Sequence, residues 1–267
     1  MKRFLYTLLL CCTIQSVYAQ DFVAHRGTVA GSYNYWFFDP KVEADPNAHF
    51  PLLIFLHGAS LCGKNLDKVK RYGPINAVAK GRSIDSYILA PQNDGGSWNP
   101  AKIMKIVDWA IEHYAVDTTR IYVYGMSLGG YGTIDLAATY PDRIAAAMAI
   151  CGGGSVKDLS GLSKVPLWII HGTADRAVRI QESDRVVEAI RATGDDSRLL
   201  YTRLPGVDHG HPARLFYMYQ TYDWLFSHSI HDEGREVCRD FEVTKKMLDA
   251  AYQDLGSRRD VVEEDYE

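Results

Sequence analysis

Short apolar runs and longer stretches with helical spacing alternate along most of the chain. Runs rich in β-branched and aromatic residues predict buried strands, and these runs cover residues 31–39, 51–56, 87–90, 121–124, 145–151, 165–170 and 199–204. Apolar positions three and four residues apart predict helices, here at residues 66–80, 100–114, 131–140, 180–193 and 212–227. This alternation predicts an α/β fold, with a mostly parallel central sheet and helices on both of its faces.

The last part of the chain has a pattern of its own. Beyond about residue 230, Phe241, Lys245, Leu248, Tyr252 and Leu255 recur at helical spacing. They predict an amphipathic helix that packs on the main domain or on a neighbour. The acidic stretch 263–267 then predicts a frayed tail. We therefore expect a main domain at residues 20–230 and a C-terminal helix with an acidic tail at 231–267.

The amino terminus has the pattern of a signal peptide. Two basic residues, Lys2 and Arg3, precede an apolar run over residues 4–12, and Val17 and Ala19 are small residues suited to a signal peptidase. We expect residues 1–19 to be removed after Ala19. A lipid anchor at one of the early cysteines is disfavoured because large residues precede them. No later segment approaches the roughly 20 apolar residues that a membrane helix needs, so we expect an exported protein, periplasmic or secreted, that is not held in a membrane.

Composition and charge exclude several classes of partner. Of 267 residues, 47% are hydrophobic and 23% are charged, which is ordinary for a globular domain. The net charge is −4 and becomes −6 on loss of residues 1–19, because two basic residues and no acidic residue are removed. Nucleic acid, which requires a basic face, is an unfavourable partner. The cysteines outside that segment, Cys62, Cys151 and Cys238, lack metal-ligand spacing, and we expect no metal or other cofactor.

The most specific chemical signal is a G-x-S-x-G pentapeptide at residues 125–129, centred on Ser127. It lies between a predicted strand and a predicted helix, and a strained turn there would lift a nucleophilic hydroxyl clear of the sheet. A serine also needs a base, and the base needs an orienting acid. Asp175 is the expected acid, because it follows the 165–170 strand. The alternative reading is a Gly-rich turn in which Ser127 merely caps the helix.

The base is expected on the loop after the last strand. This loop carries two histidines, His209 and His211. We favour His209, which has a glycine neighbour, while His211 remains an alternative. Asp208 is a weaker candidate for the acid, because it adjoins His209 in the sequence. All of these residues follow strands, and ligand sites of parallel sheets lie at the carboxyl ends of their strands.

An acyl-transfer site also needs backbone donors for the developing oxyanion. Leu128, which is first on the helix after the nucleophile, offers one N–H group and benefits from the helix dipole. The second is expected after the 51–56 strand, from Ala59, with Ser60 as its neighbour. His57, at the end of the same strand, and Trp98, on the loop after the 87–90 strand, are candidate substrate-binding residues. Trp98 is as well explained as an anchor of its loop.

Several motifs together resemble those of a known superfamily. They are His57-Gly58, the pentapeptide with Gly130 and Tyr131-Gly132, Tyr140-Pro141-Asp142-Arg143, Cys151-Gly152-Gly153-Gly154, His171-Gly172-Thr173-Ala174-Asp175 and the His209 loop. Over about residues 28–228 the chain resembles the α/β-hydrolase superfamily, and most of all its phospholipase/carboxylesterase, feruloyl-esterase and "predicted peptidase" group of exported bacterial esterases. The resemblance implies Ser127, Asp175 and His209 as catalytic residues, with Ala59 and Leu128 as oxyanion donors. The segment after residue 230 departs from the compact family members.

The spacing of the later strands bears on the substrate. Only residues 155–164 separate the glycines after the 145–151 strand from the next strand, which is too short for a cap domain. An uncovered site favours esters that are bulky or attached to a polymer. We therefore expect a serine carboxylic-ester hydrolase that acts on a small-molecule or polysaccharide-linked ester, with acetyl, feruloyl or similar acyl groups. The alternatives are a serine peptidase of the prolyl-oligopeptidase type and an inactive binding module, and the oligomeric state stays open.

Overall fold

A computed structural model describes residues 22–40, 48–253 and 255 of the chain. The expected signal peptide at 1–19 and the acidic stretch at 263–267 lie outside the described residues. The described part contains one eight-stranded sheet with the strand order β1-β2-β4-β3-β5-β6-β7-β8. Its strands are β1 Phe22–His25, β2 Asn34–Phe38, β3 Phe50–Leu56, β4 Tyr87–Gln92, β5 Val116–Met126, β6 Ala146–Ile150, β7 Leu167–Gly172 and β8 Leu199–Leu204.

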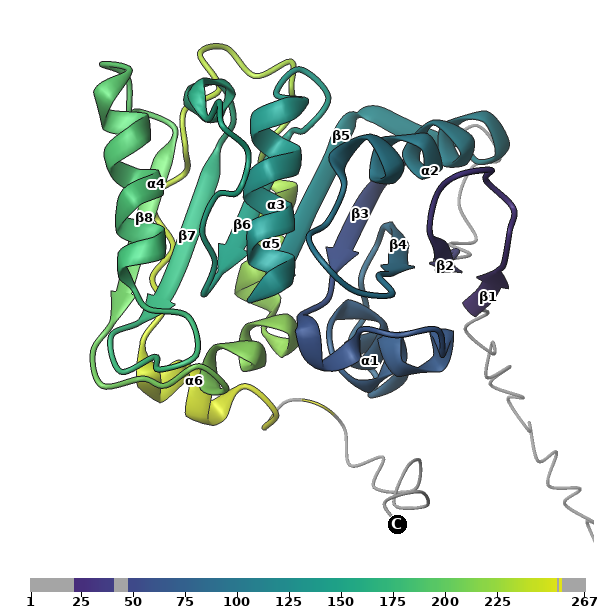
Figure 1. Cartoon of the computed structure of the whole chain (residues 1–267), viewed down its shortest axis with the longest axis horizontal. Coiled ribbons are helices and arrows are strands. Elements are labelled where there is room, and N and C mark those ends of the chain that lie inside the picture. Colours follow the sequence, from purple (N-terminus) through teal and green to yellow (C-terminus); the bar gives the residue numbers. More distant parts are fainter. Residues whose placement is uncertain (1–21, 41–47, 254, 256–267) are drawn as a thin grey trace, which may run out of the picture.

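Six of the eight strands run in parallel. Strands β4, β3, β5, β6, β7 and β8 pair in the same direction, while β1 and β2 form an antiparallel edge next to β4. The predicted α/β class and mostly parallel sheet are thus confirmed. Because parallel strands point the same way, the loops after β3, β5, β7 and β8 emerge at a single edge of the sheet (Figure 1).

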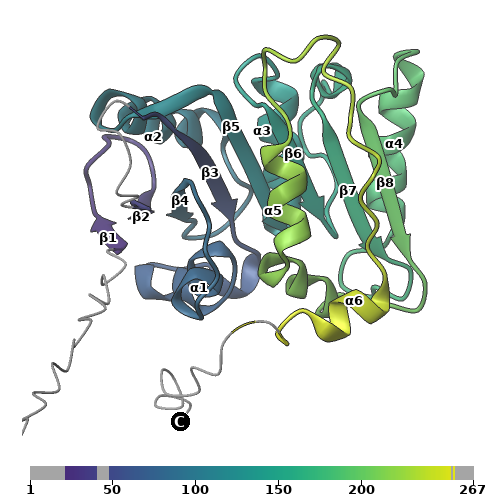
Figure 2. The same ribbon diagram turned by 180° about the vertical axis from the view of Figure 1, so that it is seen from behind.

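Helices cover both faces of the sheet (Figures 1 and 2). The α-helices are α1 Pro74–Ala79, α2 Pro100–His113, α3 Leu128–Thr139, α4 Gln181–Ala192, α5 Tyr219–Phe226 and α6 Lys245–Ala250, and the 3-10 helices are η1 Ala59–Leu61, η2 Leu66–Arg71, η3 Ser160–Lys164 and η4 His211–Tyr217. Helices α2, α3 and α4 pack on one face, and α1, α5 and α6 on the other. The segment between β6 and β7, which the structure describes completely, holds only η3.

Alternate residues of the buried strands belong to the two cores. In β3, Leu53 and Phe55 pack toward α1 and α5, while Leu52, Ile54 and Leu56 pack toward α2 and α3. This follows from the two-residue repeat of a strand, which sends successive side chains to opposite faces. Both faces are covered by helices, so β3 is an unbroken apolar run and not an alternating one.

Two predicted helices are each divided in the structure. The helix expected at 66–80 is η2 followed by α1, because Gly73 has a φ of 94° and Pro74 occupies the first turn of α1. A residue before proline is disfavoured in the helical region, so the chain turns there. The helix expected at 212–227 is η4 followed by α5, and Met218 between them is extended, with φ −96° and ψ 133°.

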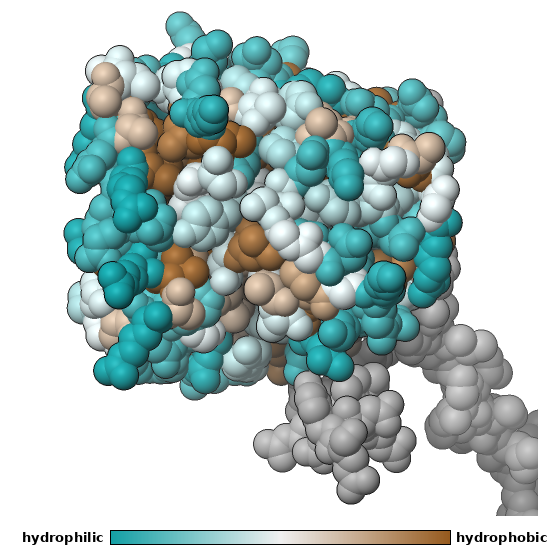
Figure 3. All heavy atoms as spheres, viewed as in Figure 1, coloured by the Kyte–Doolittle hydropathy of each residue, from teal (hydrophilic) through white to brown (hydrophobic). Residues whose placement is uncertain are grey.

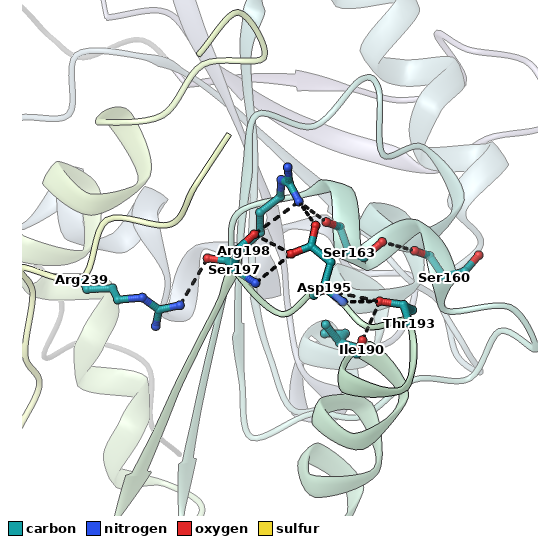
Figure 4. A network of polar contacts seen from close by, with 8 residues as sticks. All are labelled: Ser160, Ser163, Ile190, Thr193, Asp195, Ser197, Arg198 and Arg239. Atoms are coloured by element: carbon teal, nitrogen blue, oxygen red, sulfur yellow. Dashed lines mark hydrogen bonds and ion pairs between the residues drawn. The ribbon is translucent and has the colours of Figure 1, made fainter. Parts of the chain in front are cut away.

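The segment after α5 packs on the domain at both edges of the sheet. Leu248 of α6 is fully buried in the core shared with α5, and the Trp224 indole N–H donates to Cys238 O over 2.9 Å. At the opposite edge the Arg239 guanidinium donates to Ser197 O over 3.2 Å, beside the polar cluster around Arg198 (Figure 4). The helix expected near the C-terminus is thus present as α6, and it is shorter than the apolar spacing over 241–255 suggested.

The described residues include no helix with the length and apolar character needed to cross a membrane. In the orientation of Figure 1, hydrophilic side chains cover most of the surface, and the apolar ones form separate patches (Figure 3).

Candidate active site

Ser127 sits on a strained turn between β5 and α3. Its φ is 58° and its ψ is −122°, a backbone conformation that costs a residue with a side chain on the order of 1–3 kcal/mol. The Ser127 N–H donates to Ile150 O over 2.8 Å. The flanking glycines allow the close approach: a Cβ at Gly129 would lie 1.8 Å from Leu56 O, and one at Gly125 would lie 2.3 Å from Gly129 O. Close packing therefore explains both glycines of the pentapeptide, but it does not explain the serine between them.

Asp175 and His209 come together from the loops after β7 and β8. Asp175 Oδ2 lies 2.6 Å from His209 Nδ1, and Asp175 Oδ1 accepts the N–H groups of Ala177 and Val178, each over 2.9 Å. Burial raises the pKa of Asp175, but the hydrogen bonds from His209 and from these amides outweigh it, so the pKa of Asp175 is lowered. The carboxylate is ionised and held in place, which orients the ring of His209.

Ser127 and His209 face the same cavity. Its volume is about 440 Å³, and it is lined by Gly58, Ala59, Ser60, Tyr72, Met126, Ser127, Ala177, His209, Gly210 and Ala213. Since Nδ1 of His209 is held by Asp175, Nε2 is the ring nitrogen left to accept a proton. A second cavity of about 500 Å³ shares Ala177, His209 and Gly210 with the first and is also lined by Ala174, Arg176 and Asp208.

Two helix starts bring backbone N–H groups to this region. Leu128 is the first residue of α3 and Ala59 is the first residue of η1, and the first N–H groups of a helix have no acceptor within it. Ala59 lines the cavity of Ser127. The neighbouring Gly58 N–H is already bonded, because it donates to the Tyr72 hydroxyl over 2.6 Å. Ala59 and Leu128 therefore remain the candidate donors near Ser127.

The two predicted substrate-binding side chains do not reach the cavity. His57 is fully buried; its Nδ1 lies 2.7 Å from Gly58 O, and its Nε2 accepts the Asn93 N–H over 3.0 Å. Trp98 is 3% exposed, and its indole N–H donates to His57 O over 3.2 Å. Both side chains join the loop after β4 to the end of β3. The prediction that they contact substrate is corrected: proximity to a strand end did not reveal that their rings point inward.

His171 is a residue near the site that the sequence reasoning passed over. Its Nε2 lies 3.3 Å from Asp175 Oδ2 and 2.9 Å from Val178 O, and its Nδ1 lies 2.7 Å from the Ser183 hydroxyl. Burial lowers the pKa of His171, so the ring is neutral and a second hydrogen-bonding group beside the carboxylate. Its position at the end of β7, four residues before Asp175, was the available signal.

Cys151 also adjoins the carboxylate. The ligand atoms of Cys151, Asp175 and His209 lie within 4.8 Å of one another, a spacing that a metal ion could bridge. However, burial, together with the nearby carboxylate, raises the pKa of the Cys151 thiol. The contact between Asp175 and His209 within this group is explained by the hydrogen bond that orients the histidine ring.

The alternative acid and base have other contacts. His211 Nε2 lies 2.7 Å from Asp249 Oδ1 of α6. Asp208 Oδ1 accepts the N–H groups of Gly210 and His211 over 3.1 and 3.0 Å. The carboxylate partner of His211 is thus Asp249 and not Asp175. Neither His211 nor Asp208 lines the cavity of Ser127, so the structure brings together Ser127, Asp175 and His209 and keeps the two alternatives out of that group.

The chain is similar in part to known hydrolases. The model of the prolyl oligopeptidase family matches residues 85–159. A poly(3-hydroxyalkanoate) depolymerase C of Paucimonas lemoignei is 28% identical over 55% of this chain and 37% of its own length. Acetylxylan esterase A of Emericella nidulans is 41% identical over 26% of this chain and 22% of its own length. The chain thus spans well under half of the length of these relatives.

Among solved structures, a thermostable esterase is 28% identical, with a TM-score of 0.64 over 78% of this chain and 63% of that chain. A match over that share of the chain is not limited to one motif. The chain thus has the fold of the α/β-hydrolases, and it resembles the esterases with that fold.

Proposed function

We propose that the protein is a serine carboxylic-ester hydrolase with Ser127 as nucleophile, His209 as base and Asp175 as the acid that orients it. The 2.6 Å hydrogen bond between Asp175 and His209, at a cavity shared with a serine on a strained turn, carries the proposal. This combination supplies the three roles that activation of a hydroxyl requires. Polar residues that lie together by accident would not be oriented toward one another as Asp175 and His209 are.

The reaction follows from these roles. The Ser127 hydroxyl passes its proton to Nε2 of His209 as its oxygen bonds to the ester carbonyl carbon. The N–H groups of Ala59 and Leu128 stabilise the oxyanion that forms, and the Asp175 carboxylate stabilises the protonated imidazole. When the carbon–oxygen bond to the alcohol breaks, His209 returns the proton to the leaving oxygen. A water molecule then passes a proton to His209 as its oxygen bonds to the carbonyl carbon of the acyl-enzyme. When the bond from this carbon to the Ser127 oxygen breaks, His209 returns the proton to that oxygen, and the carboxylic acid is released.

The two cavities beside His209 suggest how an ester would lie. The leaving oxygen must approach His209 to receive its proton, so the alcohol would extend over the 500 Å³ cavity, where Arg176 and Asp208 can bond hydroxyl groups. The acyl group would enter the 440 Å³ cavity, whose walls include Tyr72 and Met126. A hydroxyl-rich alcohol and an uncharged acyl group suit acetyl, feruloyl or similar esters on carbohydrate, in line with the likeness to an acetylxylan esterase.

We further propose that the protein acts outside the cytoplasm after loss of residues 1–19. The basic start and the apolar run of this segment support export. Polymeric carbohydrate esters are substrates that an enzyme meets outside the cell, so the proposed location and substrate class agree. The hydrolase domain would cover residues 20–230, with residues 231–267 as a C-terminal addition.

Peptide hydrolysis is a second candidate, because the prolyl oligopeptidase family model matches residues 85–159. That segment includes Ser127 but neither Asp175 nor His209, and it identifies the turn and not the substrate. The same three residues could attack an amide. The two candidates therefore have to be separated by substrate.

The test compares purified wild type with Ser127→Ala on p-nitrophenyl acetate, methyl ferulate, acetylated xylan and a chromogenic dipeptide. Ester hydrolysis should fall by at least about a thousandfold in the variant. Ser163→Ala, in η3 at the opposite edge of the sheet, is the matched control and should act like wild type. Equal hydrolysis by wild type and Ser127→Ala would refute the proposal that the protein is a serine hydrolase, and the inactive binding module would remain as the alternative. Cleavage of the dipeptide alone would favour the peptidase.

A further inference from the structure

Two of the most exposed large hydrophobic side chains belong to residues that directly neighbour, in the sequence, the lining residues of one small cavity. In the part of the chain that the structure describes, these side chains are Val23, Tyr219 and Tyr252, and each tyrosine is 42% exposed. A cavity of about 180 Å³ lies between the start of α5 and helix α6, lined by Met218, Gln220, Met247, Ala250 and Ala251. Tyr219 and Tyr252 directly adjoin these lining residues in the chain. We call the two rings and this cavity the tyrosine platform.

We propose that the tyrosine platform binds a sugar unit of a polysaccharide, so that the polymer is held next to the catalytic cavity. The inference rests on the proposed function for the identity of the polymer, because an esterase of polymer-linked acyl groups needs a hold on the chain that carries them. It adds a binding site to the catalytic residues, with a neutral pyranose ring as the ligand.

Both rings are held in place before any ligand arrives. The guanidinium of the buried Arg82 lies 3.8 Å from the centre of the Tyr219 ring. The Tyr252 ring lies 4.8 Å from the Tyr217 ring, whose hydroxyl donates to Asn76 Oδ1 over 2.7 Å. Side chains already fixed by their neighbours lose little conformational freedom on binding.

The platform lies at the edge of the sheet that carries Ser127. Helix η4 begins directly after the His209 loop, and its Ala213 lines the catalytic cavity. Helix α6 is joined to the same loop by the 2.7 Å contact between Asp249 and His211. Figures 1 and 2 show α6 beyond the carboxyl ends of β7 and β8. A chain bound at α6 would therefore run beside the catalytic cavity.

The size and chemistry of the platform favour a sugar. A stable protein interface buries roughly 800 Å² on each partner, far more than two partly exposed rings and one small cavity offer. The apolar C–H face of a pyranose can lie on the electron-rich face of a tyrosine, while the Gln220 amide can bond its hydroxyl groups. The guanidinium groups of Arg82 and Arg214 lie 3.8 and 5.6 Å from the centres of the Tyr219 and Tyr252 rings. The residues that line the cavity are all uncharged, which favours a neutral ligand there.

Affinity electrophoresis of the full chain in gels with and without soluble unacetylated xylan tests binding without turnover. Tyr219→Ala and Tyr252→Ala should each weaken retention by about 2- to 12-fold, the equivalent of about 0.5–1.5 kcal/mol for one aromatic contact. Tyr219→Phe and Tyr252→Phe keep the ring and should retain binding. Val23→Ala, at the exposed β1 edge, is the control. With acetylated xylan as the substrate, the alanine substitutions should raise KM more than they change kcat. They should also lower the rate of hydrolysis of acetylated xylan relative to the rate of hydrolysis of p-nitrophenyl acetate.

Equal migration of wild type with and without xylan or another neutral polysaccharide would overturn the proposal, as would retention that both alanine variants keep. A chain ending at Leu255 tests whether the acidic tail is the true occupant, and retention that appears only after this truncation would also overturn it. The assay separates the two proposals. Retention without ester hydrolysis would refute the proposed esterase function and support the sugar site at the tyrosine platform. Ester hydrolysis without retention would support the esterase function and refute the sugar site.

Discussion

His57 should make folding sensitive to mild acid. Its ring is fully buried at the end of β3 and its Nε2 accepts the Asn93 N–H, so a proton on Nε2 would set a donor against a donor. Burial lowers the pKa of His57 from 6.5 to about 4, although the bond with Gly58 O acts in the opposite direction. Between these two pH values His57 is protonated in the unfolded chain and neutral in the folded protein. Stability is therefore lost as the pH falls below 6.5, and the loss is complete below about 4.

The magnitude follows from the same two pKa values. The full difference corresponds to about 3 kcal/mol, of which about 2 kcal/mol is already expressed at about pH 5. Urea unfolding, followed by tryptophan fluorescence at about pH 7.5 and about pH 5, gives the free energy of unfolding at each. The difference between the two pH values should be about 2 kcal/mol smaller in His57→Gln than in wild type. The glutamine oxygen can accept the Asn93 N–H, and glutamine does not titrate.

The comparison has a clear control and a clear refutation. His231→Gln, at an exposed position, controls for the loss of an imidazole. Burial also lowers the pKa values of His171 and His228, so wild type should lose more free energy than His57 alone accounts for. If His57→Gln and wild type lose the same free energy of unfolding over this range, His57 is not kept neutral by burial and the reasoning fails.

Three further predictions concern the candidate active site. Asp175→Asn should reduce kcat by about 10⁴-fold because the amide cannot hold His209 in the required tautomer; circular dichroism should show a folded protein, and near-normal turnover would contradict the role. Gly129→Ala places a Cβ 1.8 Å from Leu56 O and should cost about 1–3 kcal/mol, seen as a lower thermal midpoint; an unchanged midpoint would show that the turn can relax. Native protein treated with iodoacetamide should keep its esterase activity, because the Cys151 thiol is fully buried and protonated; inactivation that Cys151→Ala prevents would argue against this.

The order of elements could be predicted because burial leaves a local signature. A strand covered on both faces must be apolar throughout, as β3 is, and an amphipathic helix must repeat its apolar positions, as Ile103, Ile106 and Val107 do in α2. The Asn99 side chain accepts the Lys102 N–H at the start of α2, which is another local effect. Features of this kind depend on a few neighbouring residues, so they can be recognised in the sequence without knowledge of the fold.

The divided helices show where local patterns stop being sufficient. Gly73 and Pro74 were a visible reason to end the helix expected at 66–80, since proline restricts the residue before it. The break at Met218 had no such signal. There the Thr221 hydroxyl lies 2.9 Å from Leu215 O and 2.8 Å from Met218 O, and the packing of η4 and α5 decides where the chain turns.

The residues of the candidate site divide in the same way. The sequence alone determined that Ser127, Asp175 and His209 follow strands, and the parallel sheet then brings strand ends to one edge because all its strands point the same way. It could not determine the direction of a side chain at a strand end. Only the tertiary structure placed His209 against Asp175 and turned His57 into the interior, because ring orientation depends on partners from distant segments.

The C-terminal segment depended most on the tertiary structure. Its helical spacing predicted a helix, but no local pattern could show that Asp249 of α6 would contact His211, or that the Tyr252 ring would lie against the Tyr217 ring. These contacts join residues that are far apart in the chain, and their energies depend on packing that forms only when the whole domain folds. The chemistry of the candidate nucleophile was thus determined by local sequence, while its partners and the surface around it were decided by the fold.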